Sequence, residues 1–336
     1  MLQSTPEVKR LNRERIRKQL QAHDTFTKAE VAKWTALSLS TCNTILNEMQ
    51  NEGEIVHLSQ DESYVGRPAS RFKYNRDHLH VLVMYVVSEH DENTVAYAVA
   101  NAVGEVLSQG ALHPPTITFQ VIEDLVTAQV AADGLIRGIS FGYPGVARDG
   151  VIERCDVESL VGVDVEAQLR SKVGITPVMR NDMDFIATGV FNSIEHDGGN
   201  LGTLLFPSTG FVGCGFIIDG KPLGGSSKFA GELSYIAEGF GISRPEQQKA
   251  LLDRAAFRDF AAKMVLIACC TIDPEVVMLM GNQIDQTDLE AIQQTCEPIV
   301  SGQHLPRLLV DNDVASYYLH GLVRVMLDTL QFELTQ

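Results

Sequence analysis

The sequence lacks the features that define several classes of protein. Its six cysteines form no CxxC pair, so neither a zinc site nor a disulfide framework is expected. The longest strongly apolar stretch, residues 264–272, is far shorter than the roughly 20 residues that cross a bilayer. The first residues have no apolar core and no small-residue cleavage site, so no secretory signal is predicted. We therefore expect a cytoplasmic protein with no membrane partner, no metal and no cofactor.

Positive charge is scarce, and the basic residues are unevenly distributed. The 336 residues include 27 Lys and Arg against 43 Asp and Glu, which gives a net charge of −16. Residues 1–76 hold 12 basic and 9 acidic residues, and the remainder holds 15 and 34, so the two parts carry +3 and −19. This composition boundary predicts two modules with different partners. The length is sufficient for two or three domains.

The basic module reads as three short helices followed by a hairpin. Asn12 is expected to cap a first helix that ends near residue 23. Thr27 and Glu30 have the spacing of a capping box, in which each side chain satisfies a backbone N–H at the start of a second helix. After a tight turn, Ser38 is expected to cap a third helix over Leu39–Asn51.

The third helix has one apolar and one polar side. At 100° per residue, one stripe predicted to pack inward contains Leu39, Cys42, Ile45, Leu46 and Met49. The opposite side carries small, uncharged polar residues, namely Ser40, Asn43, Thr44 and Asn47. Such side chains can contact base edges or phosphates. Because no Arg lies on this helix, we expect Asn43 or Asn47 to contact adenine in place of an Arg–guanine contact.

Two strands, residues 54–57 and 70–74, flank a polar loop and form the predicted wing. Three helices and a wing predict a DNA-binding head whose third helix enters the major groove of an operator. The predicted DNA contacts are Arg13, Arg17, Lys28, Ser38, Ser40, Thr41, Asn43, Thr44, Asn47 and Arg67. The alternative is a small helical domain that binds proteins.

The acidic module has the pattern of a mixed α/β fold. Strands are predicted at 81–87, 94–101, 104–109, 135–141, 201–206, 212–219 and 276–280, and helices at 122–132, 165–172, 246–271 and 315–332. The first three strands have the spacing of an antiparallel meander. The predicted elements up to residue 172 and those from residue 201 onward form two series, which are compatible with two α/β lobes.

These segments resemble the ROK family of repressors, open reading frames and sugar kinases. The resemblance rests on the helix-turn-helix from Ala29 to Gly53 and on five short segments, which are Gly66-Arg67-Pro68-Ala69, Gly142-Tyr143-Pro144-Gly145, Arg180-Asn181-Asp182, the run from Val212 to Gly220, and Ala230-Gly231-Glu232-Leu233. It implies a winged helix-turn-helix, residues 1–76, before a two-lobed actin-like, ribonuclease H-like body. The implied first lobe is 77–186 with about 311–336, and the second is 187–310.

The resemblance also implies a sugar site. Asp182 would stand where the kinases of the family have their catalytic base, with Asn181 and Glu232 as neighbouring sugar contacts. A carboxylate beside a carboxamide can accept and donate hydrogen bonds to vicinal hydroxyls. The alternative is that Asn181 and Asp182 only cap a helix beginning near Phe185.

Two departures from the family concern phosphate and zinc. The first phosphate hairpin of the kinases is rich in Gly and Thr, whereas residues 87–94 here have no glycine and three carboxylates, which would repel a nucleotide. Phe211 and Val212 interrupt the second hairpin, and Met280-Gly281-Asn282 replaces the expected glycine-rich turn.

Tyr235 stands where the family's zinc-binding His would be, and residues 240–248 lack cysteine. We therefore expect neither catalysis nor zinc.

These observations favour a repressor of sugar or carbohydrate metabolism genes. Its body is expected to form a homodimer, or a tetramer of paired dimers, because one winged helix buries too little surface for useful specificity. A sugar or sugar phosphate is the expected effector. The alternatives are an ATP-dependent sugar kinase and a regulator whose body binds no ligand.

Overall fold

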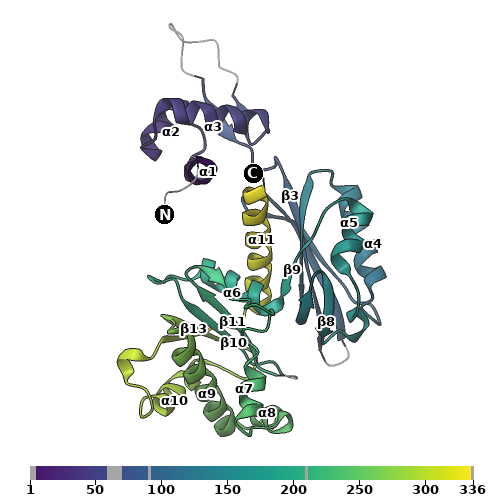
Figure 1. Cartoon of the computed structure of the whole chain (residues 1–336), viewed down its shortest axis with the longest axis vertical. Helices are drawn as coiled ribbons and strands as arrows, with labels where there is room; N and C mark the ends of the chain where they lie inside the picture. Colours follow the sequence, from purple (N-terminus) through teal and green to yellow (C-terminus); the bar gives the residue numbers. More distant parts are fainter. Residues whose placement is uncertain (1–4, 59–69, 90–91, 209–210, 334–336) are drawn as a thin grey trace.

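The computed structural model describes residues 5–58, 70–89, 92–208 and 211–333. A helical head stands above a larger α/β body (Figure 1). The head consists of α1 (Thr5–Gln21), α2 (Lys28–Thr35), α3 (Leu39–Asn51), β1 (Ile55–His57) and β2 (Phe72–Tyr74). Buried side chains including Ile16, Leu46 and Phe72 form its core.

The predicted capping of α2 and α3 is confirmed. The Thr27 N–H donates to Glu30 Oε2 at 2.7 Å, and the Glu30 N–H donates to Thr27 Oγ1 at 3.2 Å. Ser38 Oγ accepts from the N–H of Thr41 at 3.1 Å. Ala36 turns the chain between the two helices with φ of 52°. Asn12, in contrast, does not cap a helix, because α1 already begins at Thr5 and no helix-breaking residue stands between Glu7 and Asn12.

Strands β1 and β2 pair antiparallel, with Val56 opposite Lys73. They supply the two arms of the predicted wing. Residues 59–69 of the loop between them, which include Arg67 and the whole Gly66-Arg67-Pro68-Ala69 segment, lie outside the described residues.

The first large sheet has the strand order β5-β4-β3-β6-β9. It contains β3 (His80–Glu89), β4 (Glu92–Asn101), β5 (Val106–Leu112), β6 (Ile136–Tyr143) and β9 (Val178–Asn181). The predicted meander of β3, β4 and β5 is confirmed by their antiparallel pairing, with β5 shifted toward the C-terminus from its predicted range. One face is covered by α4 (Phe119–Ala132) and α5 (Val165–Val173) (Figure 1). A hairpin of β7 (Gly145–Arg148) and β8 (Val151–Cys155) follows β6.

The second large sheet has the strand order β12-β11-β10-β13-β14. Its strands are β10 (Leu201–Leu205), β11 (Gly213–Ile218), β12 (Lys221–Pro222), β13 (Val276–Met280) and β14 (Arg307–Val310). The helices beside it are α7 (Leu233–Gly239), α8 (Arg244–Ala250), α9 (Arg254–Ile272) and α10 (Gln286–Cys296). The single helix predicted at 246–271 is wrong. Ser243 and Asp253 each cap a separate helix, so the chain breaks between α8 and α9.

Two helices lie between the sheets. They are α6 (Asp182–Ser193) and α11 (Val314–Glu333), and the buried core that they share includes Phe185, Val190 and Leu322. They cross at Gly189 and Gly321, where a Cβ would lie 1.8 Å from the carbonyl oxygen of Tyr317 and of Phe185, respectively. The C-terminal end of α11 reaches the head (Figure 1). No helix among the described residues combines the length and apolar character of a membrane span.

Candidate nucleic-acid interface and ligand cavity

The polar side of α3 faces outward, as predicted. Ser40, Thr44 and Asn47 are exposed, whereas Asn43 is half-buried. Leu39 does not belong to the buried stripe, because its side chain at the first turn of α3 is 52% exposed. The prediction that Leu39 packs inward is therefore wrong, and only the four apolar residues from Cys42 onward are buried.

Several polar side chains of this surface already have partners within the head. The Thr44 hydroxyl donates to the carbonyl of Ser40 at 3.2 Å. The hydroxyls of Ser38 and Thr41 lie 2.8 Å apart. Lys28 Nζ donates to Asn47 Oδ1. Of these contacts, the one between Lys28 and Asn47 joins α3 to the start of α2.

Arg13 and Arg17 do not lie on the surface that the sequence predicted for them. They are 3% and 4% exposed. Arg13 Nη2 donates to Glu54 Oε2 at 2.7 Å and also pairs with Glu52, and Arg17 forms two hydrogen bonds to Glu54. Burial alone would raise the pKa of Glu54, but the two guanidinium groups outweigh it and lower the pKa. We correct the prediction of an exposed position for these two residues, because both arginines form a buried ion-pair cluster within the head.

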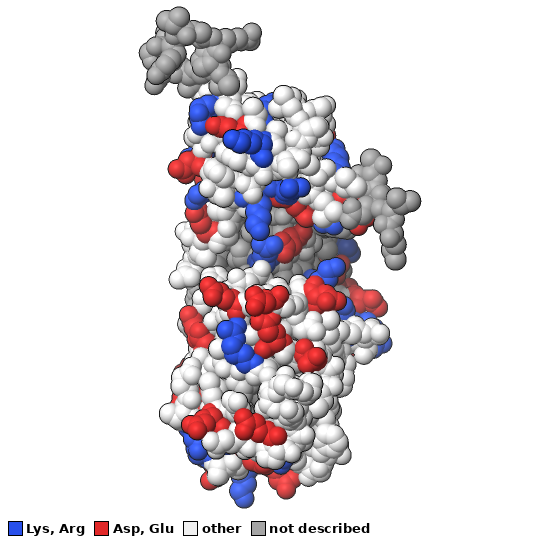
Figure 2. All heavy atoms as spheres, turned by 90° about the vertical axis from the view of Figure 1, so that its left-hand side faces the viewer, with Lys and Arg blue, Asp and Glu red and all other residues white. Residues whose placement is uncertain are grey.

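The head and the body differ in the sign of their surface charge. On the face drawn in Figure 2, Lys and Arg side chains gather over the head, and Asp and Glu predominate over the body. The buried cluster removes two basic and two acidic residues from the head, leaving 10 against 7, so its balance of +3 is unchanged. The head therefore keeps the sign of charge that a nucleic acid attracts.

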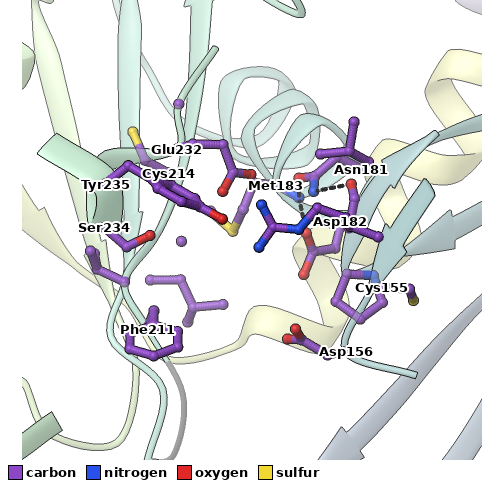
Figure 3. Close-up of a pocket in the computed structure, with 18 of the residues that line it drawn as sticks. Cys155, Asp156, Asn181, Asp182, Met183, Phe211, Cys214, Glu232, Ser234 and Tyr235 are labelled. Carbon is purple, nitrogen blue, oxygen red and sulfur yellow. Dashed lines mark hydrogen bonds between the residues drawn. The ribbon is translucent and has the colours of Figure 1, made fainter. Parts of the chain in front are cut away.

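A cavity of about 370 Å³ lies between the two lobes of the body and brings together the predicted ligand residues. Figure 3 shows Asn181 and Asp182 on one side and Glu232 on the other. Asp182 opens α6, and Glu232 immediately precedes α7, so ligand contact with both would join the two lobes. The wall also includes Gly145, Arg154, Asp156, Phe211, Cys214, Tyr235 and Arg244.

The carboxyl groups of this cavity share a weakly solvated environment. Burial raises the pKa of Asp182 to about 7, opposed by a hydrogen bond from the Met183 N–H and assisted by the charges of Asp156 and Glu232. Burial likewise raises the pKa of Glu232 and of Asp156. The carboxyl group of Asp182 can therefore either donate a hydrogen bond to a hydroxyl or accept one from it near neutral pH.

Asn181 is the N-cap of α6. Its Oδ1 accepts from the Met183 N–H at 2.8 Å, and its Nδ2 donates to the Gly145 carbonyl at 2.9 Å. The predicted alternative of helix capping therefore describes Asn181, although α6 begins at Asp182 and not near Phe185. Asp182 points into the cavity (Figure 3), and its role as a sugar contact stays a prediction.

Tyr235 and Arg244 form a packed group at the cavity wall. The Arg244 guanidinium lies 4.5 Å from the ring centre of Phe211 and 4.8 Å from that of Tyr235. Arg154, from β8 of the first lobe, lies 5.3 Å from the same Tyr235 ring. Cation–π contacts thus connect Tyr235 to both neighbours. The described residues contain no group of three or more His, Cys, Asp or Glu side chains able to hold a metal.

Sequence reasoning missed Arg154, Asp156 and Arg244 as residues of the cavity. Arg154 and Asp156 come from β8 and the residue directly after it, whereas Arg244 comes from α8, so the two parts meet only when the lobes are assembled. In the sequence, Phe211 and Tyr235 stand out only as departures from the family pattern. No spacing in the sequence joins these five positions.

Comparison with solved structures identifies the fold. A ROK family transcriptional regulator, described as a homologue of the Escherichia coli Mlc protein, matches with a TM-score of 0.71 over 98% of this chain and 99% of its own, at 14% identity. The ROK hexokinase of Thermus thermophilus matches with a TM-score of 0.58 at 16% identity, over 76% of this chain and all of its own. The regulator therefore matches nearly the whole chain, and the kinase about three quarters of it.

Sequence comparison finds a likeness over part of the chain. The xylose repressor of Caldicellulosiruptor bescii is 21% identical over 245 residues, which are 69% of this chain and 60% of the repressor. The chain thus spans less than two thirds of that relative's length. No family model matches the sequence. The whole-chain structural match shows that this chain has the fold of the ROK family transcriptional regulator.

Proposed function

We propose that the protein is a DNA-binding repressor of carbohydrate metabolism genes, with a body that senses a sugar or sugar phosphate and catalyses no reaction. The observation that carries this proposal is the outward polar side of α3 in a complete helix-turn-helix with paired wing strands. The relatives named as xylose repressor and transcriptional regulator support it. A homodimer would present two heads to two half-sites.

A continuous path of packed residues supports coupling between the cavity and the head. Asp182 stands at the first turn of α6, and α6 crosses α11 through Gly189 and Gly321. At its far end α11 places Leu327 and Leu330 beside Arg17 and Tyr74 of the head. A ligand that favoured one arrangement of the lobes could therefore change the position of the head, by as much as its affinities for the two arrangements differ.

The sugar-kinase alternative is less well supported. Phe211 places an aromatic ring at the cavity, packed on Arg244, where the family's phosphate hairpin has a small residue. In the first hairpin, Glu92 pairs with Glu89 across the turn between β3 and β4. The predicted hairpin residues at 90–91 and 209–210 lie outside the described residues. A coupled assay for ADP release with a panel of hexoses tests this alternative, and sugar-dependent turnover would reject our proposal.

The DNA-binding part can be tested by footprinting. The full-length protein is expected to protect a two-fold symmetric site in the promoter DNA next to its own gene. Asn43→Ala should weaken this binding by about 1–3 kcal/mol, the usual cost of losing one good base contact. Unchanged protection by this variant would contradict the assignment of α3 to DNA.

The sensing part needs a separate experiment. Titration calorimetry against hexoses, amino sugars and their phosphates should give saturable heat with at least one of them, and Asp182→Asn should reduce it while operator affinity stays nearly unchanged. The second alternative, a body that only dimerises, predicts no saturable heat with any of these compounds.

A further inference from the structure

The outward side chains of α3 divide into two groups by their hydrogen bonds. Thr44, Thr41 and Ser38 use their hydroxyls within the head, and the Asn47 carboxamide oxygen accepts from Lys28. Within the described part of the chain, the side chain of Asn43 has no hydrogen-bond partner. A ligand of α3 would therefore find the carboxamide of Asn43 unengaged and that of Asn47 occupied on its oxygen.

The unengaged groups lie at the beginning of the helix. Leu39 and Asn43 fall within its first two turns and are neighbours at i and i+4. In helix-turn-helix proteins the N-terminal part of the recognition helix contacts base edges. A leucine that is 52% exposed at this position loses contact with water when it meets an apolar group.

The chemistry of this surface favours one kind of base pair. A carboxamide bonds in a bidentate manner to N6 and N7 of adenine, and aliphatic groups contact the methyl group of thymine. The bidentate partner of guanine is Arg or Lys, and α3 contains neither among its 13 residues. The Thr44 hydroxyl proton is committed to Ser40, which leaves its methyl group as a further apolar contact.

We propose that the head recognises A·T base pairs in the major groove, with Asn43 bound to adenine and Leu39 against a neighbouring thymine methyl group. Asn47 does not contact a base, and instead holds the ammonium group of Lys28 at the edge of α3, where it meets a phosphate. This inference rests on the proposed DNA-binding function and adds the class of operator sequence to it.

The test begins with selection of binding sites from random duplex DNA by the full-length protein. We expect an A·T step in each half-site. Chemical probes then locate the contacts, since deoxyuridine removes the thymine methyl group and 7-deazaadenine removes the adenine N7. Each replacement in that step should weaken binding about tenfold, whereas 7-deazaguanine elsewhere in the half-site should change it less than twofold.

Two variants assign the residues. Asn43→Ala should bind the normal and the 7-deazaadenine operators equally, because the group that senses N7 is absent. Leu39→Ala should lose its sensitivity to deoxyuridine. Asn47→Ala is the matched control, and it should keep both sensitivities. Retained N7 sensitivity in Asn43→Ala, or strong dependence on guanine N7, would overturn the inference while leaving DNA binding intact. Absence of binding to any DNA would reject the proposed function itself.

Discussion

Arg17 and Glu54 form a bidentate ion pair inside the head, with Nε and Nη2 of the arginine donating to the two carboxylate oxygens. The exposed fractions of the two side chains are 5% and 1%. Arg17 also lies beside Leu327 and Leu330 of α11, so this pair is at the junction of head and body. Because both side chains are buried, we infer that this ion pair stabilises the fold of the head.

Removing one partner of this pair should destabilise the head strongly. Glu54→Ala leaves Arg13 and Arg17 buried without a shared counterion, and we expect a loss of about 3–5 kcal/mol in unfolding free energy. Urea denaturation followed by circular dichroism measures it. Lys9→Ala, which breaks an exposed pair with Glu48, is the control and should cost at most about 1 kcal/mol.

A variant of the same cluster can distinguish a structural role of Arg17 from a direct contact with DNA. If Arg17→Ala kept the stability of the parent protein and lost only operator binding, the original prediction of a DNA contact would be right, and our correction would be wrong.

Asp182 should make stability depend on pH. Its pKa is about 7 in the folded chain and about 3.9 in an unfolded one, so the folded state binds the proton more tightly between these values. Stability should therefore fall as pH rises from about 4 to 7, and the loss should be complete above that range. Asp182→Asn should raise the melting temperature at pH 8 and raise it clearly less at pH 5, where about a third of the loss has occurred.

The control for this experiment is Glu290→Gln, at an exposed position of α10. It should shift the melting temperature equally at both pH values. A shift for Asp182→Asn that is the same at pH 5 and pH 8 would show that Asp182 does not titrate in this window.

The helix crossing of α6 and α11 should tolerate no added carbon. In Gly321→Ala the new Cβ would lie 1.8 Å from the Phe185 carbonyl oxygen, so the helices must separate. Overpacking of this kind costs about 1–3 kcal/mol, which a shift of the urea midpoint would reveal. Gly134→Ala, where a Cβ meets no atom within 4 Å, is the matched control. Equal midpoints for the two variants would contradict the crossing geometry.

Zinc should be absent from the purified protein, and a chelator should leave its melting temperature unchanged. The wall beside Glu232 is held by the packing of Arg244 between Phe211 and Tyr235, none of which is a zinc ligand in this arrangement. Elemental analysis checks this. One equivalent of zinc, or a chelator-induced fall in stability, would mean that a metal site had been missed.

Local features were predictable from the sequence because they depend on neighbours along the chain. The capping box of Thr27 and Glu30 and the buried stripe from Cys42 to Met49 are spacing patterns, and both are present. The start of α1 was misplaced because Asn12 suits a cap but is also tolerated inside a long helix.

Features that depend on distant segments were not predictable in the same way. Arginine is usually exposed, and the burial of Arg13 and Arg17 is possible only because Glu54, which directly precedes β1, pairs with both. Arg154 and Arg244 likewise meet at Tyr235 from opposite lobes. The prediction that Asp182 and Glu232 lie at one cavity came from the family resemblance. Such a resemblance supplies a tertiary arrangement, which spacing along the sequence cannot.

The buried arginines also bear on how the head responds to ionic strength. Each phosphate that a protein neutralises releases counterions and steepens the fall of affinity with salt. Two of the guanidinium groups that would do this are enclosed with carboxylates. Operator occupancy should consequently decline less steeply with added electrolyte than it would if both arginines neutralised phosphates.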